Sequence, residues 1–191
     1  MGNNFLAKIF NNEIVRIIFA LVLVGVLSGA VLVFIYNYSM PKIKVNIQKE
    51  TEKAINTIFP GAASNSPTKD KGVYSVKDST GKVIGYAFIA EGNGYQGLIK
   101  LLAGADAKIS ILKGIEVLES SETPGLGAEI NTESFQKQFV GLPLTHDIEY
   151  VKNQKPEKPY QIEAITGATI SSRAVVNILN GKINEIKKTL K

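Results

Sequence analysis

The chain has 191 residues, no cysteine, a single histidine and a formal net charge of +5. Its length predicts one membrane segment followed by one soluble domain of roughly 150 residues. The lack of cysteine excludes disulfides, iron–sulfur clusters and thiolate zinc sites. His146 alone cannot form a multi-histidine metal site, so we predict no metal site and give this residue no role. The lysines are spread along the chain rather than clustered with aromatic residues, which argues against nucleic acid as a partner.

A long apolar run near the N-terminus predicts a membrane helix. Residues 17–36 contain no charge, and Ser28 is their one clearly polar residue. Twenty helical residues reach about 30 Å, the thickness of a bilayer core. A cleaved signal peptide would have a shorter apolar run that ends in small residues, whereas this run leads to Tyr36-Asn37-Tyr38-Ser39-Met40-Pro41. We therefore predict a transmembrane helix over residues 16–38, with the lipid bilayer as a partner.

The charges beside this helix leave its orientation open. Two cations precede it, Lys8 and Arg16, and three follow it closely, Lys42, Lys44 and Lys49. A count of positive charges would keep the C-terminal domain inside the cell, but long domains cross membranes largely regardless of charge.

A helical stalk and a sheet are predicted next. We predict the stalk over residues 39–60, where Pro60-Gly61 ends it, and a polar loop over residues 62–70. Turn signals then occur at Asp78-Ser79-Thr80-Gly81, Gly92-Asn93-Gly94 and Gly104-Ala105-Asp106. They separate four strands at hairpin spacing, which favours an antiparallel sheet over a Rossmann domain. The predicted strands are residues 73–77, 83–90, 95–102 and 109–118.

The remaining elements make the predicted fold class α+β. A loop over residues 122–127 contains Thr-Pro-Gly, a turn sequence that is common in purely structural loops. A short helix is predicted over residues 132–139, with strands at 148–151 and 160–165. The last helix is expected to begin at about Ser172. Its apolar stripe recurs at the helical period and consists of Val175, Leu179, Ile183 and Ile186.

The segment between the last strand and the last helix is rich in small residues. Thr166, Gly167, Ala168 and Thr169 precede the helix, so a ligand could lie close against this backbone. The unpaired N–H groups and the positive dipole end of a helix N-terminus favour an anion there. The simpler interpretation is that Thr169 or Ser171 is only an N-cap, a frequent role of Ser and Thr.

Two motifs resemble those of a known family. Thr166-Gly167-Ala168-Thr169 is similar to the flavinylation motif of the G subunit of Rnf-type ferredoxin:NAD oxidoreductase complexes, which is related to the C subunit of the sodium-pumping NADH:quinone reductase. Glu122-Thr123-Pro124-Gly125-Leu126-Gly127 matches a second motif of these families. The family usually has Asp three residues before the first Thr of the flavinylation motif, where this chain has Glu163.

The resemblance implies an FMN-binding domain over residues 61–191. It implies that FMN is bound covalently, through a phosphoester to Thr169, by a separate flavin transferase. Its phosphate would lie against neighbouring small residues and its ring against the second motif. The implied cofactor-binding residues are Thr169, Thr166, Gly167, Ala168, Ser171, Ser172, Glu122, Thr123 and Leu126.

The implied function is electron transfer within a redox-driven ion-translocating complex. The chain would be a single-pass inner-membrane subunit with a cytoplasmic segment at residues 1–15 and an extracytoplasmic flavin domain. Its partners would be the other membrane and redox subunits of the complex. We predict no catalytic residue and no nucleotide-binding loop for NAD in this chain. We also predict no complete site for ferredoxin or NAD. Two alternatives stay open: a free-standing extracytoplasmic flavoprotein that serves another reductase, and a non-redox binding or scaffold module.

Overall fold

The computed structural model describes residues 13–68, 70 and 72–189. Residues 1–12, most of the predicted cytoplasmic segment, lie outside the described residues. The chain divides into two compact units, Met1–Lys49 and Glu50–Lys191. We describe each unit by itself.

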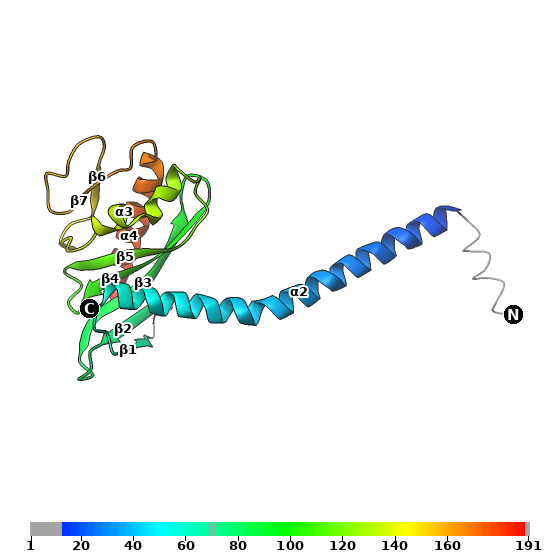
Figure 1. Cartoon of the computed structure of the whole chain (residues 1–191), viewed down its shortest axis with the longest axis horizontal. Helices are drawn as coiled ribbons and strands as arrows, with labels where there is room; N and C mark the ends of the chain where they lie inside the picture. Colours follow the sequence, from blue (N-terminus) through cyan, green and yellow to red (C-terminus); the bar gives the residue numbers. More distant parts are fainter. Residues whose placement is uncertain (1–12, 69, 71, 190–191) are drawn as a thin grey trace. The chain divides into compact units, whose positions relative to one another are not determined.

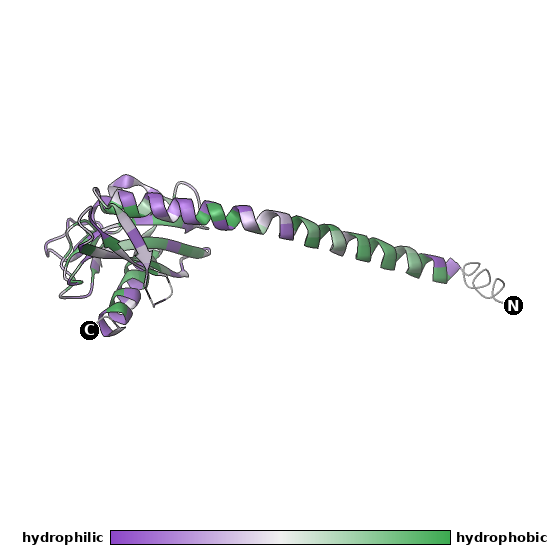
Figure 2. Cartoon of the chain, turned by 90° about the horizontal axis from the view of Figure 1, so that it is seen from below, coloured by the Kyte–Doolittle hydropathy of each residue, from purple (hydrophilic) through white to green (hydrophobic). Residues whose placement is uncertain are grey.

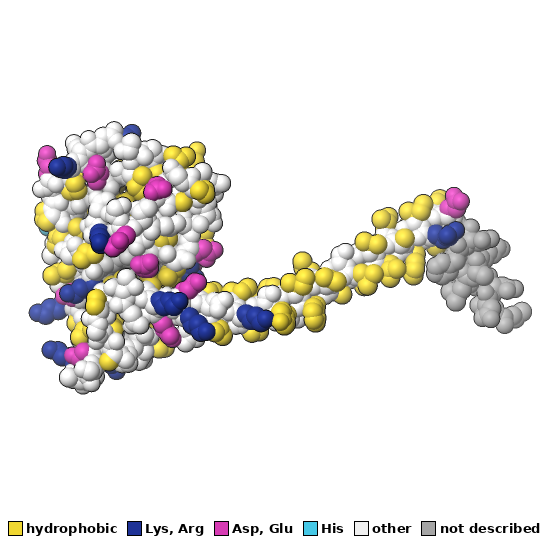
Figure 3. Space-filling view, in the orientation of Figure 1, with side chains coloured by type: hydrophobic (Ala, Val, Ile, Leu, Met, Phe, Trp, Pro, Cys, Tyr) yellow, Lys and Arg dark blue, Asp and Glu magenta, His cyan; other side chains and the backbone are white. Residues whose placement is uncertain are grey.

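The first unit consists, in its described part, of the apolar portion of helix α2 (Glu13–Ile58). This helix is long and apolar enough to cross a membrane. Figure 2 shows the hydrophobic colouring along this portion, and on the visible face in Figure 3 charged side chains occur only near its two ends. The predicted membrane segment and the predicted stalk form one continuous helix, with Pro41 inside it.

The second unit contains a five-stranded antiparallel sheet in which every strand pairs with its neighbour in sequence, in the order β1-β2-β3-β4-β5 (Figure 1). This sheet, with helices around it, confirms the predicted α+β class. The strands are β1 (Ser64–Pro67), β2 (Val73–Lys77), β3 (Val83–Asn93), β4 (Leu98–Asp106) and β5 (Leu112–Ser120).

Several predicted boundaries in the sheet are wrong. Residues 64–67, predicted as loop, form β1, because their backbone pairs with β2 from Ser64↔Lys77 to Pro67↔Tyr74 despite a polar, proline-containing sequence. Gly104-Ala105-Asp106 ends β4 and does not form a turn. The turn follows it, because the Asp106 carboxylate accepts hydrogen bonds from the backbone N–H groups of Ser110 (2.6 Å) and Ile111 (2.8 Å). Gly92 and Asn93 likewise belong to β3.

The two faces of the sheet pack against different helices. One face and α4 (Thr169–Thr189) form the larger core, which includes Phe88, Leu101, Val175 and Leu179. The other face packs against the end of α2 through Ala54, Ile55, Ile58 and Phe59.

Two glycines make room for the Phe59 ring on the second face. A Cβ on Gly85 would lie 2.5 Å from this ring, and one on Gly104 would lie 2.6 Å from it. The absence of side chains at these positions therefore lets α2 approach the sheet closely.

The remaining elements complete the larger core. They are the 3-10 helix η1 (Gly127–Asn131), α3 (Glu133–Lys137), β6 (Glu149–Val151) and β7 (Gln161–Glu163). Strands β6 and β7 pair in parallel, and the predicted strand at residues 160–165 is shorter than expected. Phe135 and Phe139 share a buried face, with ring centroids 5.4 Å apart.

Helix α4 begins at Thr169, three residues earlier than predicted. The Ser172 N–H already donates to the Ala168 carbonyl at 3.0 Å, which closes the first helical turn. All four residues of the predicted apolar stripe are buried.

Candidate functional site

A pocket of about 470 Å³ lies at the N-terminus of α4. Its walls come from three segments that are distant in the sequence: the start of α4, the loop after β5 and the turn between β3 and β4. Lys152, just after β6, completes the lining. The lining residues are Tyr95, Glu122, Thr123, Leu126, Gly127, Lys152, Gly167, Ala168, Thr169, Ile170 and Ser171.

A tight turn connects β7 to α4. Gln138 holds the end of β7, since its side chain accepts from the Glu163 N–H at 2.7 Å and donates to the Glu163 carbonyl at 3.2 Å. The Ala168 N–H then donates to the Ile165 carbonyl at 3.0 Å. Gly167 has a φ of +83°, a left-handed conformation that glycine adopts without strain. Gly167 therefore lets the chain reverse at the helix start without backbone strain.

The first turn of α4 presents backbone donors at the pocket. Among the described residues, the N–H groups of Thr169, Ile170 and Ser171 have no protein acceptor. The N-terminus of a 21-residue helix also carries the positive end of the helix dipole. Together these features favour an anionic group at this end of the pocket.

The hydroxyl groups around the pocket differ in their availability. Ser171 and Ser172 are buried: the Ser171 hydroxyl donates to Glu122 Oε2, and the Ser172 hydroxyl donates to the Ala168 carbonyl at 3.1 Å. The Thr123 hydroxyl donates to Gln96 Oε1. Thr169 is half-buried and, among the described residues, its hydroxyl has no hydrogen-bond partner. It is therefore the one aliphatic hydroxyl in the pocket lining that is free to react.

Thr166 lies in the exposed turn and outside the pocket lining. Gly167 and Ala168 do line the pocket. The hydroxyls of Ser171 and Ser172 donate hydrogen bonds within the protein, which favours a positioning role over direct contact with a phosphate.

Glu122 is a buried carboxylate, a residue only 6% exposed. Its Oε1 accepts the Gln96 N–H at 2.9 Å, and its Oε2 accepts the Ser171 hydroxyl. Burial by itself would raise its pKa, but the hydrogen bonds from Ser171 and from the backbone of Gln96, Gly97 and Tyr95 outweigh burial and hold the pKa below its ordinary value. Glu122 is therefore ionised at neutral pH.

Exposed apolar side chains border the pocket. Tyr95 is 70% exposed, Leu126 50% and Ile170 45%. Sequence reasoning identified Leu126 but missed Tyr95 and Ile170, although an aromatic residue inside the glycine-rich run 92–97 could have drawn attention. Lys152 was also missed, because nothing in its local sequence connects it to the motif.

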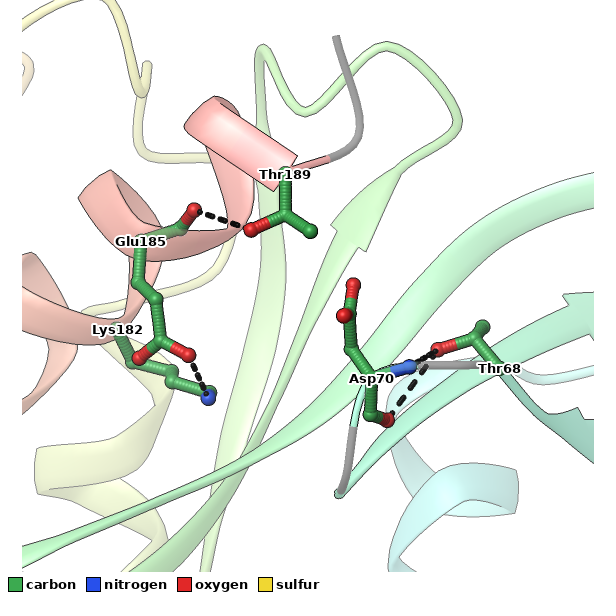
Figure 4. Close-up of polar contacts among 5 residues, drawn as sticks. All are labelled: Thr68, Asp70, Lys182, Glu185 and Thr189. Carbon is green, nitrogen blue, oxygen red and sulfur yellow. Dashed lines mark hydrogen bonds and ion pairs between the residues drawn. The ribbon is translucent and has the colours of Figure 1, made fainter.

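A second groove, of about 650 Å³, lies between β3 and α4 and contains none of the predicted site residues. Its charged side chains are paired, Lys182 with Glu185 at 2.8 Å (Figure 4) and Lys100 with Glu91 at 3.9 Å. Within the part of the chain that the structure describes, no three His, Cys, Asp or Glu side chains gather to hold a metal ion.

Comparison with known proteins identifies the domain. Residues 94–184, which include every residue of the pocket lining, match the FMN-binding domain family. The chain is 36% identical over 186 residues to the G subunit of the ion-translocating oxidoreductase complex of Methanosarcina acetivorans, an alignment that covers 92% of this chain and 96% of the relative. It is 28% identical to the G subunit of the proton-translocating ferredoxin:NAD(+) oxidoreductase complex of Clostridium ljungdahlii, over 92% of each chain.

A solved structure shares the fold. The crystal structure of Shewanella oneidensis NqrC superposes with a TM-score of 0.54 at 22% identity, covering 64% of this chain and 65% of that one. At this level of identity the likeness concerns the fold alone.

The fold and the matched domain define an FMN-binding protein with one long apolar N-terminal helix. The chain belongs to the family of G subunits of ion-translocating oxidoreductase complexes, which is related to the C subunits of Na(+)-translocating NADH-quinone reductases. This confirms the family that the two sequence motifs indicated.

Proposed function

We propose that this chain is the membrane-anchored electron-transfer subunit of an Rnf-type ion-translocating ferredoxin:NAD oxidoreductase complex, and that it transfers electrons through an FMN esterified to Thr169. The observation that carries the proposal is the free Thr169 hydroxyl, which lies at a helix N-terminus inside the pocket of an FMN-binding domain. Family membership supports the assignment to a complex with other membrane and redox subunits.

The pocket fits FMN in size and chemistry. Its volume lies within the range of about 300–1,000 Å³ that small-molecule sites usually have. The N–H groups of Thr169, Ile170 and Ser171 suit a phosphate, with Lys152 as a neighbouring cation. Tyr95, Leu126 and Ile170 offer apolar surface for a flat ring. When bound, FMN supplies the reversible uptake and release of electrons.

The covalent step needs an activating enzyme. No described side chain contacts the Thr169 hydroxyl as a base, and an unactivated threonine is a weak nucleophile. A flavin transferase would therefore use FAD as donor: the Thr169 oxygen forms a bond to the phosphate next to the ribityl chain, and the bond between the two phosphates breaks. AMP leaves, the hydroxyl proton passes to a base of the transferase or to solvent, and no electron is transferred.

A fluorescence and mass measurement tests the attachment. The protein, co-expressed with the transferase, should show flavin fluorescence on a denaturing gel. Thr169→Ala should lose the FMN adduct in intact-mass spectra, whereas Thr166→Ala should keep it. An adduct on Thr169→Ala would overturn the acceptor assignment. A wild-type protein without flavin under these conditions would instead favour the non-redox scaffold.

We further propose that α2 spans the inner membrane once and that the flavin domain is extracytoplasmic. Support for an anchor comes from the length and hydropathy of α2 and from the family. Protease added to intact cells or spheroplasts should remove the flavin domain. Complete protection until lysis would show that the domain faces the cytoplasm, as the count of flanking lysines suggests.

Isolation of the complex distinguishes the proposed function from the remaining alternative, a free-standing flavoprotein. A member of the complex should co-purify with other membrane and redox subunits after mild solubilisation. A flavinylated chain that purifies alone from such membranes would indicate a free-standing flavoprotein.

A further inference from the structure

Glu122 joins three segments that are distant in the sequence. It follows β5 directly, and its carboxylate contacts Gln96, 26 residues earlier, and Ser171, 49 residues later. Gln96 belongs to the turn between β3 and β4, and Ser171 to the first turn of α4. These three segments are the walls of the pocket that we assign to FMN.

The surroundings of Glu122 are tightly packed. A Cβ on Gly94 would lie 2.3 Å from Glu122 Oε1, and a Cβ on Gly127 would lie 2.3 Å from Glu122 Oε2. Any side chain at either glycine would displace the carboxylate. Both oxygens are thus held by hydrogen bonds and by close packing, which leaves the carboxylate little freedom to turn towards a ligand.

The partners of Glu122 are donors. The backbone N–H of Gln96 can only donate, and the Ser171 hydroxyl gives its proton to Oε2. Donation to a charged acceptor is stronger than donation to a neutral one. A carboxylate suits this position better than a carboxamide, whose NH₂ group would face one of these donors.

We propose that Glu122 is the positioning residue of the flavin site: it holds the β3–β4 turn and the first turn of α4 in the arrangement that presents the Thr169 hydroxyl and the Tyr95 side chain to the cofactor. Glu122 acts on the site through its hydrogen bonds with Ser171 and with the backbone of Gln96. Its role in FMN attachment rests on the proposed function. The coupling of the two walls can be measured without any flavin.

Glu122→Gln preserves the shape of the side chain and removes its charge. If the amide oxygen still accepts the hydrogen bond from the Gln96 N–H, the NH₂ group faces Ser171. The Ser171 hydroxyl must then accept a hydrogen bond where it now donates one. The first turn of α4 and the β3–β4 turn should both loosen. Glu119→Gln is the matched control, because Glu119 is an exposed carboxylate on β5 outside the pocket lining.

Hydrogen exchange of the unflavinylated full-length protein tests the coupling. Glu122→Gln should speed amide exchange at Tyr95–Gly97 and at the start of α4 together, while Glu119→Gln changes neither. Unchanged exchange at either segment in Glu122→Gln would overturn the proposal. This result does not depend on whether the protein carries a flavin.

Flavin attachment tests the consequence. With transferase and FAD, Glu122→Gln should attach FMN about tenfold more slowly than wild type, a difference of about 1.4 kcal/mol in the barrier, and the bound flavin should have a shifted absorption spectrum. Ser171→Ala should share both effects, since it removes one of the two contacts. A purely structural role would lower only the melting temperature and leave the rate and spectrum of the folded protein unchanged. That result would overturn the proposal, whereas a flavin-free wild type would overturn the proposed function.

Discussion

Ser172 and Ile165 close the turn that leads into α4: the Ser172 hydroxyl accepts the Ile165 N–H at 3.0 Å and donates to the Ala168 carbonyl at 3.1 Å. This fully buried hydroxyl thus bridges the backbone on both sides of Gly167. Ser172, which the family resemblance implied as a cofactor-binding residue, therefore stabilises the protein's own turn.

Removal of this hydroxyl should destabilise the domain. Ser172→Ala leaves the Ile165 N–H without an acceptor, which costs about 1–3 kcal/mol. Urea unfolding of the unflavinylated protein measures the loss. Ser121→Ala is the control, because Ser121 is exposed and should change stability by less than about 0.5 kcal/mol. Equal effects of the two substitutions would contradict the bridging role.

Lys152 should speed FMN attachment through its charge. It lines the pocket at which, in the proposed function, the anionic donor arrives. Lys152→Gln should then slow attachment about two- to fivefold, as expected for an exposed ion pair of about 0.2–1 kcal/mol. Lys155→Gln, an exposed neighbour outside the lining, should have no effect. The measurement is the rate of adduct formation at low and high salt. Because salt screens exposed charges, a difference that persists unchanged at high salt would argue against an electrostatic role.

Acid should weaken the domain partly through Glu122. The pKa of this carboxyl lies below its ordinary value of 4.5, so it contributes stability above that value, and the contribution is lost as the pH falls through the folded-state pKa. Glu122→Gln removes this contribution. Its free energy of unfolding should fall less steeply than that of wild type when the pH drops below about 4.5. Urea unfolding between pH 3 and 7 checks the slopes, and parallel curves would contradict the prediction.

Glu116 provides a control of opposite sign. Burial raises the pKa of the Glu116 carboxyl above its ordinary value, so ionisation of this carboxyl disfavours the folded state. The folded state therefore loses stability from this group as the pH rises. Glu116→Gln should therefore raise the free energy of unfolding more at neutral pH than in acid, which urea unfolding over the same pH range measures.

Two glycine substitutions should change stability in opposite directions. A Cβ on Gly104 would lie 2.5 Å from Ile58 and 2.6 Å from Phe59, so Gly104→Ala should destabilise by about 1–3 kcal/mol through overpacking. Gly181 lies inside α4, and a methyl group added there would meet no atom within 4 Å beyond its chain neighbours and the backbone of its own helix. Gly181→Ala should stabilise by about 0.5–1 kcal/mol, since alanine is the better helix former. Thermal unfolding distinguishes the two, and a stabilising Gly104→Ala would contradict the close approach of α2.

The sequence was most informative where the signal is local. Twenty uncharged residues predicted the apolar helix, alternating strands and turn residues predicted an antiparallel α+β domain, and Thr166-Gly167-Ala168-Thr169 predicted the position of the site. Hydrophobic periodicity and short turn motifs depend on residues that are neighbours in the chain, so they can be recognised without a structure.

Tertiary structure decided which groups of the site are available. Thr169, Ser171 and Ser172 are neighbouring hydroxyl residues that the sequence does not distinguish. Of these three, only Thr169 has a free hydroxyl, because the other two hydroxyls donate hydrogen bonds to Glu122 and to the backbone of the turn. Lys152 and Tyr95 join the pocket from segments with no motif of their own. These relationships depend on contacts between residues that are tens of positions apart in the sequence. Packing of the sheet against α4 brings these residues together, and no local sequence pattern indicates such contacts.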